Sequence, residues 1–427
     1  MRFLYTLLLW LLLPVVLVRL MLRGRRQPEY LQHVGERFGL YPVQSELSRC
    51  TKWVGEKVIW LHAVSVGETR ATVNLIAKLR ETYPDHQILL TNMTPTGRAT
   101  SEQLYGDEVL RFYLPYDYPF VMRRFLRHFK PRIAILMETE LWFNLIHESH
   151  KAHVPMLLLN ARLSEKSAKG YAKVPGLTRN ALRKLTAIAA QTEDDAVRLS
   201  KLGAQRVSVM GNLKYDIVPP PMMKVMGLSL REQFGVGRKV LLAASTREGE
   251  EALLLDAFQK YLPDLLLVIV PRHPQRFEEV AGMLARRGLR YQRKSENRVV
   301  SAEVNVVLGD SMGEMFAYYA ACDLAFIGGS LLPFGAQNLI EACSVGTPVL
   351  IGLHTYNFAD ASRLAIDAGA AVRVKSADEL FVVAQKLLND ADELANMGIQ
   401  GLRFVSAHQG AIHKAMAIIK NFLAVPV

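Results

Sequence analysis

The chain has 427 residues, half of them hydrophobic, so it is too long for one hydrophobic core and too apolar for a disordered chain. Lys and Arg number 52 and Asp and Glu 40, and the resulting charge of +12 favours anionic partners such as nucleic acid, acidic lipid or phosphorylated substrates. The three cysteines show no metal-ligand spacing, which indicates reduced thiols in a cytoplasm and no disulfide framework.

The N-terminal residues predict an uncleaved membrane anchor over residues 1–26. The stretch Phe3–Val18 carries no charge, and four arginines follow it: Arg19, Arg23, Arg25 and Arg26. A helix over Phe3–Leu22 would be about 30 Å long, close to the thickness of a bilayer core. A signal peptide would instead carry its charges before the apolar stretch and a small-residue cleavage site after it. The basic flank favours the cytoplasmic side. Pro14 and Arg19 leave open whether the helix spans the bilayer or lies in one leaflet.

Beyond the anchor, short apolar stretches alternate with amphipathic ones, which predicts parallel sheets with helices on both faces. The strands expected in the first half are Val58–Ala63, Gln87–Thr91, Val109–Leu114, Ile133–Met137, Met156–Asn160, Ala187–Gln191 and Val207–Met210. Those expected in the second half are Val240–Ala244, Leu265–Val270, Arg290–Arg293, Val304–Leu308, Asp323–Ile327 and Pro348–Ile351. Helical spacing is clear in Thr69–Glu81 and Tyr118–Phe129.

Three consecutive prolines, Pro219 to Pro221, interrupt this alternation, because tripled proline continues neither a helix nor a central strand. The sequence therefore predicts two βα domains joined near residues 212–232, with boundaries at 27–215 and 216–427. In open α/β sheets, ligands bind at the carboxyl ends of the strands, so functional residues should follow the strands directly.

The first half holds three candidate sites. Glu68 follows the first strand and a glycine, where a carboxylate could act as a general base, but Ser65-x-x-Glu68 is also a capping box. Glu138 and Glu140 follow the strand that ends at Met137, where they could handle protons or be first-turn helix acids favoured by the macrodipole. Lys214 lies at the domain junction, where a lysine faces either a cleft or solvent.

In the second half, polar or glycine-containing segments follow successive strands. They are Ser245–Glu250, Pro271–Pro274, Gly309–Glu314, Gly328–Ser330 and Gln337–Glu341. Arg272 and His273 supply donors for a phosphate, and Glu341 could accept hydrogen bonds from a ribose. Two of the segments, at Ser245–Glu248 and Ser311–Glu314, also have the spacing of a capping box. Five such segments in one domain indicate a nucleotide site.

Several known motifs are absent from the sequence. There is no G-x-x-x-x-G-K-[ST] P-loop, and no G-x-G-x-x-G follows a strand, which disfavours a dehydrogenase. No D-x-D follows a strand, so no metal site and no cofactor are expected.

Together these segments resemble those of the bacterial 3-deoxy-D-manno-octulosonic acid (Kdo) transferases. The matching strings are Trp60–Thr69, Thr94–Gly97, Tyr113–Asp117, Met137–Trp142, Asn160–Ser164, Val270–Pro274, Gly309–Glu314 and Phe326–Ser330. The resemblance implies the GT-B fold, two Rossmann-like domains with a cleft between them, after the N-terminal anchor. It also implies that residues 27–215 bind the acceptor and residues 216–427 bind the donor, CMP-Kdo.

The implied reaction is an inverting, metal-independent transfer of Kdo to a hydroxyl of a lipid A precursor, at the cytoplasmic face of the bacterial inner membrane, in lipopolysaccharide biosynthesis. By motif match, Glu68 corresponds to the proton acceptor, and Glu138 and Lys214 to positions that stabilise the transition state. The CMP-contacting segments correspond to Arg272 with His273, to Met312, Gly313 and Glu314, and to Asn338, Leu339, Ile340 and Glu341.

One segment departs from the family pattern, which is Gly-Gly-His-Asn-Pro-Leu-Glu. Here Gln337 and Leu339 replace its His and Pro, while Asn338 and Glu341 persist. Another GT-B transferase that uses a UDP-sugar on a lipid acceptor is the alternative. A membrane-tethered nucleic-acid-binding protein is disfavoured, because the aromatic residues lie mostly in strands and in the anchor instead of along a basic stripe. A scaffold would not need these acids and glycine-containing segments.

Overall fold

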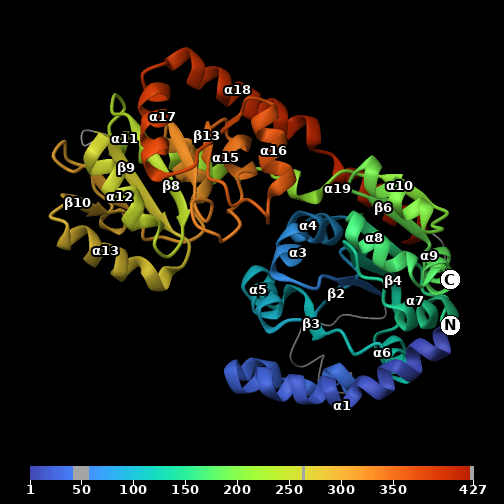
Figure 1. Cartoon of the computed structure of the whole chain (residues 1–427). Coiled ribbons are helices and arrows are strands. Elements are labelled where there is room, and N and C mark those ends of the chain that lie inside the picture. Colours follow the sequence, from blue (N-terminus) through green and yellow to red (C-terminus); the bar gives the residue numbers. More distant parts are fainter. Residues whose placement is uncertain (42–56, 262–264, 424–427) are drawn as a thin grey trace. The chain divides into compact units, whose positions relative to one another are not determined.

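The computed structural model describes residues 1–41, 57–261 and 265–423. The chain forms two compact units (Figure 1): residues 1–216 with 409–427, and residues 217–408. The crossing at Asp216–Ile217 lies where the proline-rich break was expected, and the helix α11 begins at Pro221. Cys50 lies outside the described residues, and the other two cysteines are free thiols.

The first unit contains a parallel sheet of seven strands in the order β3-β2-β1-β4-β5-β6-β7. The strands are β1 Val58–His62, β2 Gln87–Asn92, β3 Leu110–Tyr113, β4 Pro131–Met137, β5 Met156–Ala161, β6 Ala187–Ala190 and β7 Val207–Val209. All seven were predicted from the sequence. The strand order reverses between β1 and β4, so the loops after these two strands flank the switch point of the sheet.

Helices cover both faces of this sheet. They are α3 Val66–Ala71, α4 Val73–Thr82, α5 Pro95–Tyr105, α6 Pro119–Phe129, α7 Phe143–Lys151, α8 Glu165–Ala172, α9 Pro175–Lys184, α10 Glu193–Lys201 and α19 Ala411–Leu423. Side chains of α6, α7 and α9 pack with Trp60 on one face, and those of α4 and α19 pack on the other. Fully burying a large apolar side chain contributes about 1.5–3 kcal/mol, so these two layers account for much of the stability of the unit.

The predicted helix Thr69–Glu81 is divided at Thr72. The hydroxyl of Thr72 donates to the carbonyl of Thr69 at 2.8 Å, a local hydrogen bond that competes with the helical pattern. The short helix α3 that results carries Glu68 in its first turn.

The second unit repeats the design, with a parallel sheet in the order β10-β11-β9-β8-β12-β13-β14. Its strands are β8 Val240–Thr246, β9 Leu266–Pro271, β10 Tyr291–Arg293, β11 Val306–Leu308, β12 Leu324–Ile327, β13 Val349–Ile351 and β14 Ala371–Arg373. Its helices are α11 Pro221–Phe234, α12 Glu250–Tyr261, α13 Phe277–Arg286, α14 Met315–Ala321, α15 Ile340–Ser344, α16 Ala359–Asp367, α17 Ala377–Leu388 and α18 Ala391–His408. Six of these strands match the prediction. The sequence analysis missed β14, because a strand of three residues is too short to show alternating apolar and polar side chains.

The last helix returns to the first unit, whereas the sequence pattern predicted that the second domain continues to residue 427. Ala411, Ala415 and Ile419 of α19 recur every four residues and pack into the core of the first unit. The carboxylate of Asp216 accepts from the backbone N–H of Gly410, at 2.5 Å, and from that of Ile412. The chain passes between the units twice, at residues 216–217 and 408–409. Asp216 therefore holds both passages together within the first unit.

The N-terminal helix α1, Arg2–Arg26, belongs to the first unit and is long and apolar enough to cross a membrane. The 3-10 turns η1, Pro28–Leu31, and η2, Val34–Phe38, follow it. In Figure 1, α1 runs along the first unit beside α6 and α7.

Candidate active site

Glu68 stands at the switch point of the first sheet, in the helix that directly follows β1. Its Oε1 accepts from the hydroxyl of Ser65 at 2.9 Å, and its Oε2 accepts from the backbone N–H of Val64 at 2.7 Å. Ser65 is the N-cap of α3, as predicted, and accepts from the backbone N–H of Glu68. The carboxylate bonds to Val64 in place of the N-cap backbone N–H, so the capping box is only half formed.

The electrostatic environment of Glu68 favours its protonated form. Burial raises the pKa of Glu68 to about 7, and the nearby carboxylates Glu138 and Glu140 raise it too, against the lowering effect of the hydrogen bonds from Val64 and Ser65. A carboxyl group with a pKa near 7 exchanges protons readily at neutral pH, which is the property required of a general base. The structure therefore brings two of the predicted acids to the candidate base.

Glu138 follows β4 directly and adopts a left-handed conformation with φ 61°, which is uncommon for a residue other than glycine. Its N–H donates to the carbonyl of Leu159 at 3.1 Å, which fixes the turn to β5. Helix α7 begins only at Phe143, so Glu138 and Glu140 are not first-turn helix acids, and that alternative is wrong. Burial and Glu138 also raise the pKa of Glu140.

Lys214 lies half-buried on the 3-10 turn η4, Leu213–Tyr215, just before the crossing between the units. The neighbouring Leu213 donates its N–H to Oδ1 of Asn160 at 3.1 Å, and Asn160, the penultimate residue of β5, has φ 55°. Gln191, after β6, donates to the carbonyl of Asn160 and accepts from Asn212. Hydrogen bonds between strand ends therefore hold the lysine on the same sheet edge as Glu138.

In the second unit, the loops after β8 and β9 carry several basic side chains. Arg272 follows β9 and is bound through its N–H to the carbonyl of Thr246 at 3.0 Å. His273 is exposed, and its pKa is lowered by partial burial and by the charges of Arg247 and Arg272. The guanidinium of Arg247 lies 4.5 Å from the ring centroid of Phe334. This cluster has the charge and the donors to hold an anion.

The segment Met312–Glu314 precedes α14 at the end of the β11 loop. Met312 is 48% exposed, and Gly313 has φ +82° with no neighbouring atom within 4 Å of the place that a Cβ would take, so this stretch of backbone is open. Glu314 accepts from the ammonium of Lys294 at 2.7 Å and from the hydroxyl of Ser311. Ser311 is not the N-cap, because α14 begins after Glu314, and Ser245 lies within β8, so neither predicted capping box forms.

The segment Asn338–Glu341 is divided between surface and core. Asn338 donates to the carboxylate of Glu341 at 3.1 Å and accepts from the N–H of Ile340. Glu341 and Arg272 both act electrostatically on the buried Tyr319, which places the two side chains in one neighbourhood. Leu339 and Ile340 are fully buried, so only their backbone can meet a ligand.

Sequence reasoning missed the role of Glu250 at the switch point of the second sheet. This fully buried carboxylate accepts from the N–H groups of Arg247 at 2.9 Å, Gly329 at 2.6 Å and Leu331 at 3.0 Å. It therefore ties the loop after β8 to the loop after β12. The next acid, Glu251, is also fully buried and pairs with Arg276 at 2.6 Å. Two adjacent acids after a buried strand were the only signal in the sequence.

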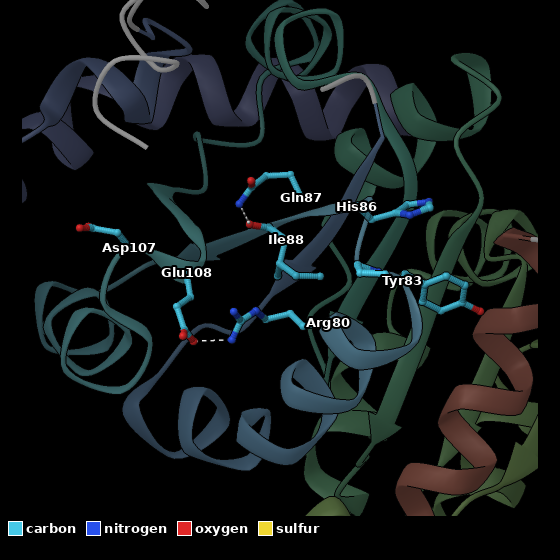
Figure 2. A pocket seen from close by; sticks show the side chains of 8 residues that line it. Arg80, Tyr83, His86, Gln87, Ile88, Asp107 and Glu108 are labelled. Atoms are coloured by element: carbon cyan, nitrogen blue, oxygen red, sulfur yellow. Dashed lines mark hydrogen bonds and ion pairs between the residues drawn. The ribbon is translucent and has the colours of Figure 1, made fainter. Parts of the chain in front are cut away.

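A separate pocket of about 390 Å³ lies at the opposite edge of the first sheet. It is lined by residues at the end of α4, the start of β2 and the turn before β3, and Figure 2 shows Arg80 paired with Glu108 there. Gln87 of this pocket pairs with Val58, the first residue of β1, whereas Glu68 follows the last residue of that strand. The pocket is therefore not part of the candidate active site.

Comparison with known proteins gives a consistent result. Residues 32–217 match the family model described as 3-deoxy-D-manno-octulosonic-acid transferase (kdotransferase). The 3-deoxy-D-manno-octulosonic acid transferase of Haemophilus influenzae is 36% identical to this chain, over 99% of each chain. That of Bordetella pertussis is 40% identical, over 86% of this chain and 87% of the relative.

Solved structures share the fold at low identity. A glycosyltransferase from Rickettsia africae has a TM-score of 0.53 and 14% identity, over 87% of this chain and 99% of its own. Anabaena Alr3699/HepE, solved in complex with UDP and glucose, has a TM-score of 0.52 and 16% identity, over 86% and 99%. The chain therefore has the two-domain GT-B fold that the sequence resemblance implied.

Proposed function

The chain belongs to the 3-deoxy-D-manno-octulosonic acid (Kdo) transferase family and is a glycosyltransferase of lipopolysaccharide synthesis, and we propose that it takes Kdo from CMP-Kdo and attaches it to a hydroxyl of a lipid A precursor. In this reaction the bond between the anomeric carbon and the CMP phosphate breaks, and a bond from the acceptor oxygen to that carbon forms. The acceptor proton passes to a base, and CMP leaves with the electron pair.

Glu68 is the proposed proton acceptor. An alcohol is too weakly acidic to react unaided, so a placed base is needed. The support for this role is the position of Glu68 at the switch point, with a pKa of about 7 that is set first by burial and then by neighbouring charges. Its two hydrogen-bond donors hold the carboxylate in one orientation.

Glu138 and Lys214 are proposed to stabilise the transition state. Positive charge develops on the sugar as the bond to phosphate breaks, and the carboxylate of Glu138 would oppose that charge. Lys214 would either neutralise the sugar carboxylate or orient Glu138. Support comes from the hydrogen bonds that Glu138 and Leu213, the neighbour of Lys214, make to Leu159 and Asn160 of β5.

The second unit is proposed to bind CMP-Kdo, and the first unit to bind the acceptor. Arg272 and His273 would donate to the phosphate, the open backbone at Met312–Glu314 would border the nucleotide, and Asn338 with Glu341 would bind the ribose hydroxyls. Leu339 and Ile340 would contribute through their backbone alone, because their side chains are buried.

We further propose that the transfer inverts the anomeric configuration and needs no metal ion or other cofactor. Arg272 and Arg247 would supply the positive charge that the departing phosphate requires. Activity should therefore persist in EDTA, and strict dependence on Mg²⁺ would contradict this proposal. Nuclear magnetic resonance of the product would establish its anomeric configuration.

The proposed location is the cytoplasmic face of the bacterial inner membrane, with no nucleic-acid partner. The apolar helix α1 with its basic C-terminal turn supports this location, because cytoplasmic flanks carry excess Arg and Lys.

Product analysis tests the proposal as a whole. Purified full-length protein is incubated with CMP-Kdo and a lipid A precursor, and the product is weighed by mass spectrometry. A mass increase by one or more Kdo units is expected. Turnover of a UDP-sugar, with no turnover of CMP-Kdo, would favour the alternative transferase, and so would tighter binding of UDP than of CMP in calorimetry.

A further inference from the structure

The two faces of α1 differ in a way that a simple membrane tether does not require. One face carries apolar side chains that are exposed at helical spacing: Phe3, Leu4, Leu7, Leu8, Leu11, Leu12, Val15, Val18, Met21 and Leu22. We call these ten residues the apolar stripe. The opposite face turns toward the body of the first unit, where Leu20 and Gly24 are buried.

The docked face makes specific polar contacts. The hydroxyl of Tyr5 donates to Asp117 at 2.8 Å, and the hydroxyl of Thr6 donates to Oδ1 of Asn144 at 3.1 Å. Both acceptors are buried, Asp117 at 3% exposure and Asn144 at 0%. Asp117 also accepts from two N–H groups at the start of α7, so α1 completes a network that organises the body.

Further contacts extend along the same side. Arg2 lies 3.3 Å from the buried carboxylate of Glu148. Tyr118 donates to the carbonyl of Leu9 at 2.7 Å, and the ring of Trp10 stacks on Phe120 with 5.7 Å between centroids. A helix that crossed a bilayer away from the body would forfeit these contacts and leave Asp117, Asn144 and Glu148 with fewer partners. A buried polar group without a partner is costly, so the docked arrangement is favoured.

From these observations we propose that α1 lies in the plane of one membrane leaflet, docked on the first unit, with the apolar stripe among the acyl chains. The partner that covers the apolar stripe is therefore a membrane leaflet that contains anionic lipid. Charge complementarity supports this choice, because basic side chains flank the stripe on α1 and on the adjacent α6: Arg19, Arg23, Arg25, Arg26, Arg123, Arg124 and Arg127.

This arrangement places the membrane close to the acceptor side of the reaction. The chain passes from α1 through η1 to η2, where the guanidinium of Arg37 donates to the carbonyl of Met93 at 3.2 Å. Met93 directly follows β2 at the carboxyl edge of the sheet, the edge that carries Glu68. A lipid-linked hydroxyl would therefore approach the base from the membrane surface. The inference rests on the proposed membrane location.

Cross-linking of membrane-bound protein tests the docked geometry. Full-length Thr6→Cys/Asn144→Cys protein is bound to vesicles of phosphatidylethanolamine and phosphatidylglycerol and then oxidised. An intramolecular disulfide should form in vesicles as it does in detergent. Trp10→Cys/Phe120→Cys with a short bifunctional thiol reagent is a second pair at partly exposed positions, in case the first destabilises the fold. Leu8→Cys/Asn144→Cys, with one residue of the stripe, is the matched control and should not cross-link.

Flotation with the same vesicles tests the stripe. Leu8→Gln/Leu11→Gln/Val15→Gln should reduce vesicle binding at least tenfold. Met222→Gln/Val225→Gln/Leu228→Gln replaces three exposed apolar residues on α11 and should bind as the wild type does.

Three results would overturn the proposal, each in a different way. Cross-links that form in detergent but not in vesicles would show that α1 leaves the body and spans. Unchanged flotation of the stripe variant, with a smaller oligomer in solution, would show that the stripe joins two copies of the chain. Failure of the wild type to float would count against the membrane location itself.

Discussion

The two switch points of the molecule have the same topology, but the carboxylates beside them accept hydrogen bonds from different sets of donors. Between β1 and β4, burial together with the nearby Glu138 and Glu140 raises the pKa of Glu68 to about 7, against the lowering effect of its two hydrogen-bond donors. Between β8 and β12, burial also raises the pKa of Glu250, but this carboxylate accepts from three backbone N–H groups and so binds two loops together.

The comparison shows how the number of hydrogen-bond donors around an acid at the end of a strand affects what that acid can do. A carboxylate that accepts from three backbone amides is a structural anchor, because its loss would leave three N–H groups without this acceptor. A carboxylate with few donors and like charges nearby retains proton affinity near neutrality. At this position of the fold, the first unit therefore carries the proposed base, and the second unit carries an acid that holds two loops together.

The largest expected effect is that of Glu68→Gln. If Glu68 is the base, turnover should fall about a hundred- to ten-thousandfold, the usual contribution of general base catalysis. CMP affinity and thermal unfolding should stay close to wild type, because glutamine preserves shape and is accepted in a capping box. Glu81→Gln, on the surface of α4, is the control. Near-normal turnover of Glu68→Gln would leave this residue only a helix-capping role.

Arg272→Ala should weaken CMP binding in calorimetry by about 1.5–3 kcal/mol, roughly ten- to 150-fold, through loss of a charge-assisted hydrogen bond. Arg290→Ala removes an exposed arginine of the same unit and should bind CMP normally. Equal affinities for both variants would rule Arg272 out as a phosphate ligand.

Glu250→Gln should lower the free energy of unfolding by about 1–3 kcal/mol, because an amide cannot accept from all three N–H groups. CMP affinity should fall as well, since the loops after β8 and β12 lose their common anchor. Denaturant unfolding and calorimetry measure the two effects, and Glu303→Gln, an exposed acid, is the control. Wild-type values for Glu250→Gln would show that the two loops are held by other contacts.

The raised pKa of Glu68 predicts how activity and stability depend on pH. Because the base must be ionised, kcat/KM should decline as pH falls through about 7, roughly tenfold at one unit below that pKa. Stability should show the opposite trend. The folded pKa lies above the ordinary value of 4.5, so the folded state holds its proton longer, and the free energy of unfolding falls as pH rises from 4.5 to about 7. Glu68→Gln should show a weaker trend, because the pKa values of Asp117, Glu140 and Glu250 are also raised by burial. An unchanged trend in that variant would assign it to those other groups.

The smallest expected effect is that of Ser65→Ala. Loss of the N-cap should cost about 1 kcal/mol of stability. Loss of the hydroxyl donor should also move the pH profile of kcat/KM upward, since the Ser65 hydrogen bond lowers the pKa of Glu68. Thr192→Ala removes a comparable N-cap from α10 and should lower stability without moving the profile. A shift in both variants would contradict a specific effect on Glu68.

Local pattern was enough to predict thirteen of the fourteen strands in the described part of the chain, the helix α6 and the position of the break before α11. Strand-end placement also led to Glu68, Glu138, Lys214 and Arg272, because a buried apolar stretch followed by polar residues marks the edge of a parallel sheet. The family match rests on the order of the same segments.

The sequence could not decide contacts between distant residues. The apolar repeat of α19 does not say which sheet it covers, and only packing assigned it to the first unit. Helical spacing in α1 was masked by its uniformly apolar composition, so its docked face emerged only from Tyr5, Thr6 and their buried partners. The difference between Glu68 and Glu250 likewise depends on how many N–H groups converge on each carboxylate. Periodicity is a property of neighbouring residues and is written in the sequence, whereas desolvation and hydrogen-bond saturation depend on groups that only the tertiary fold brings together.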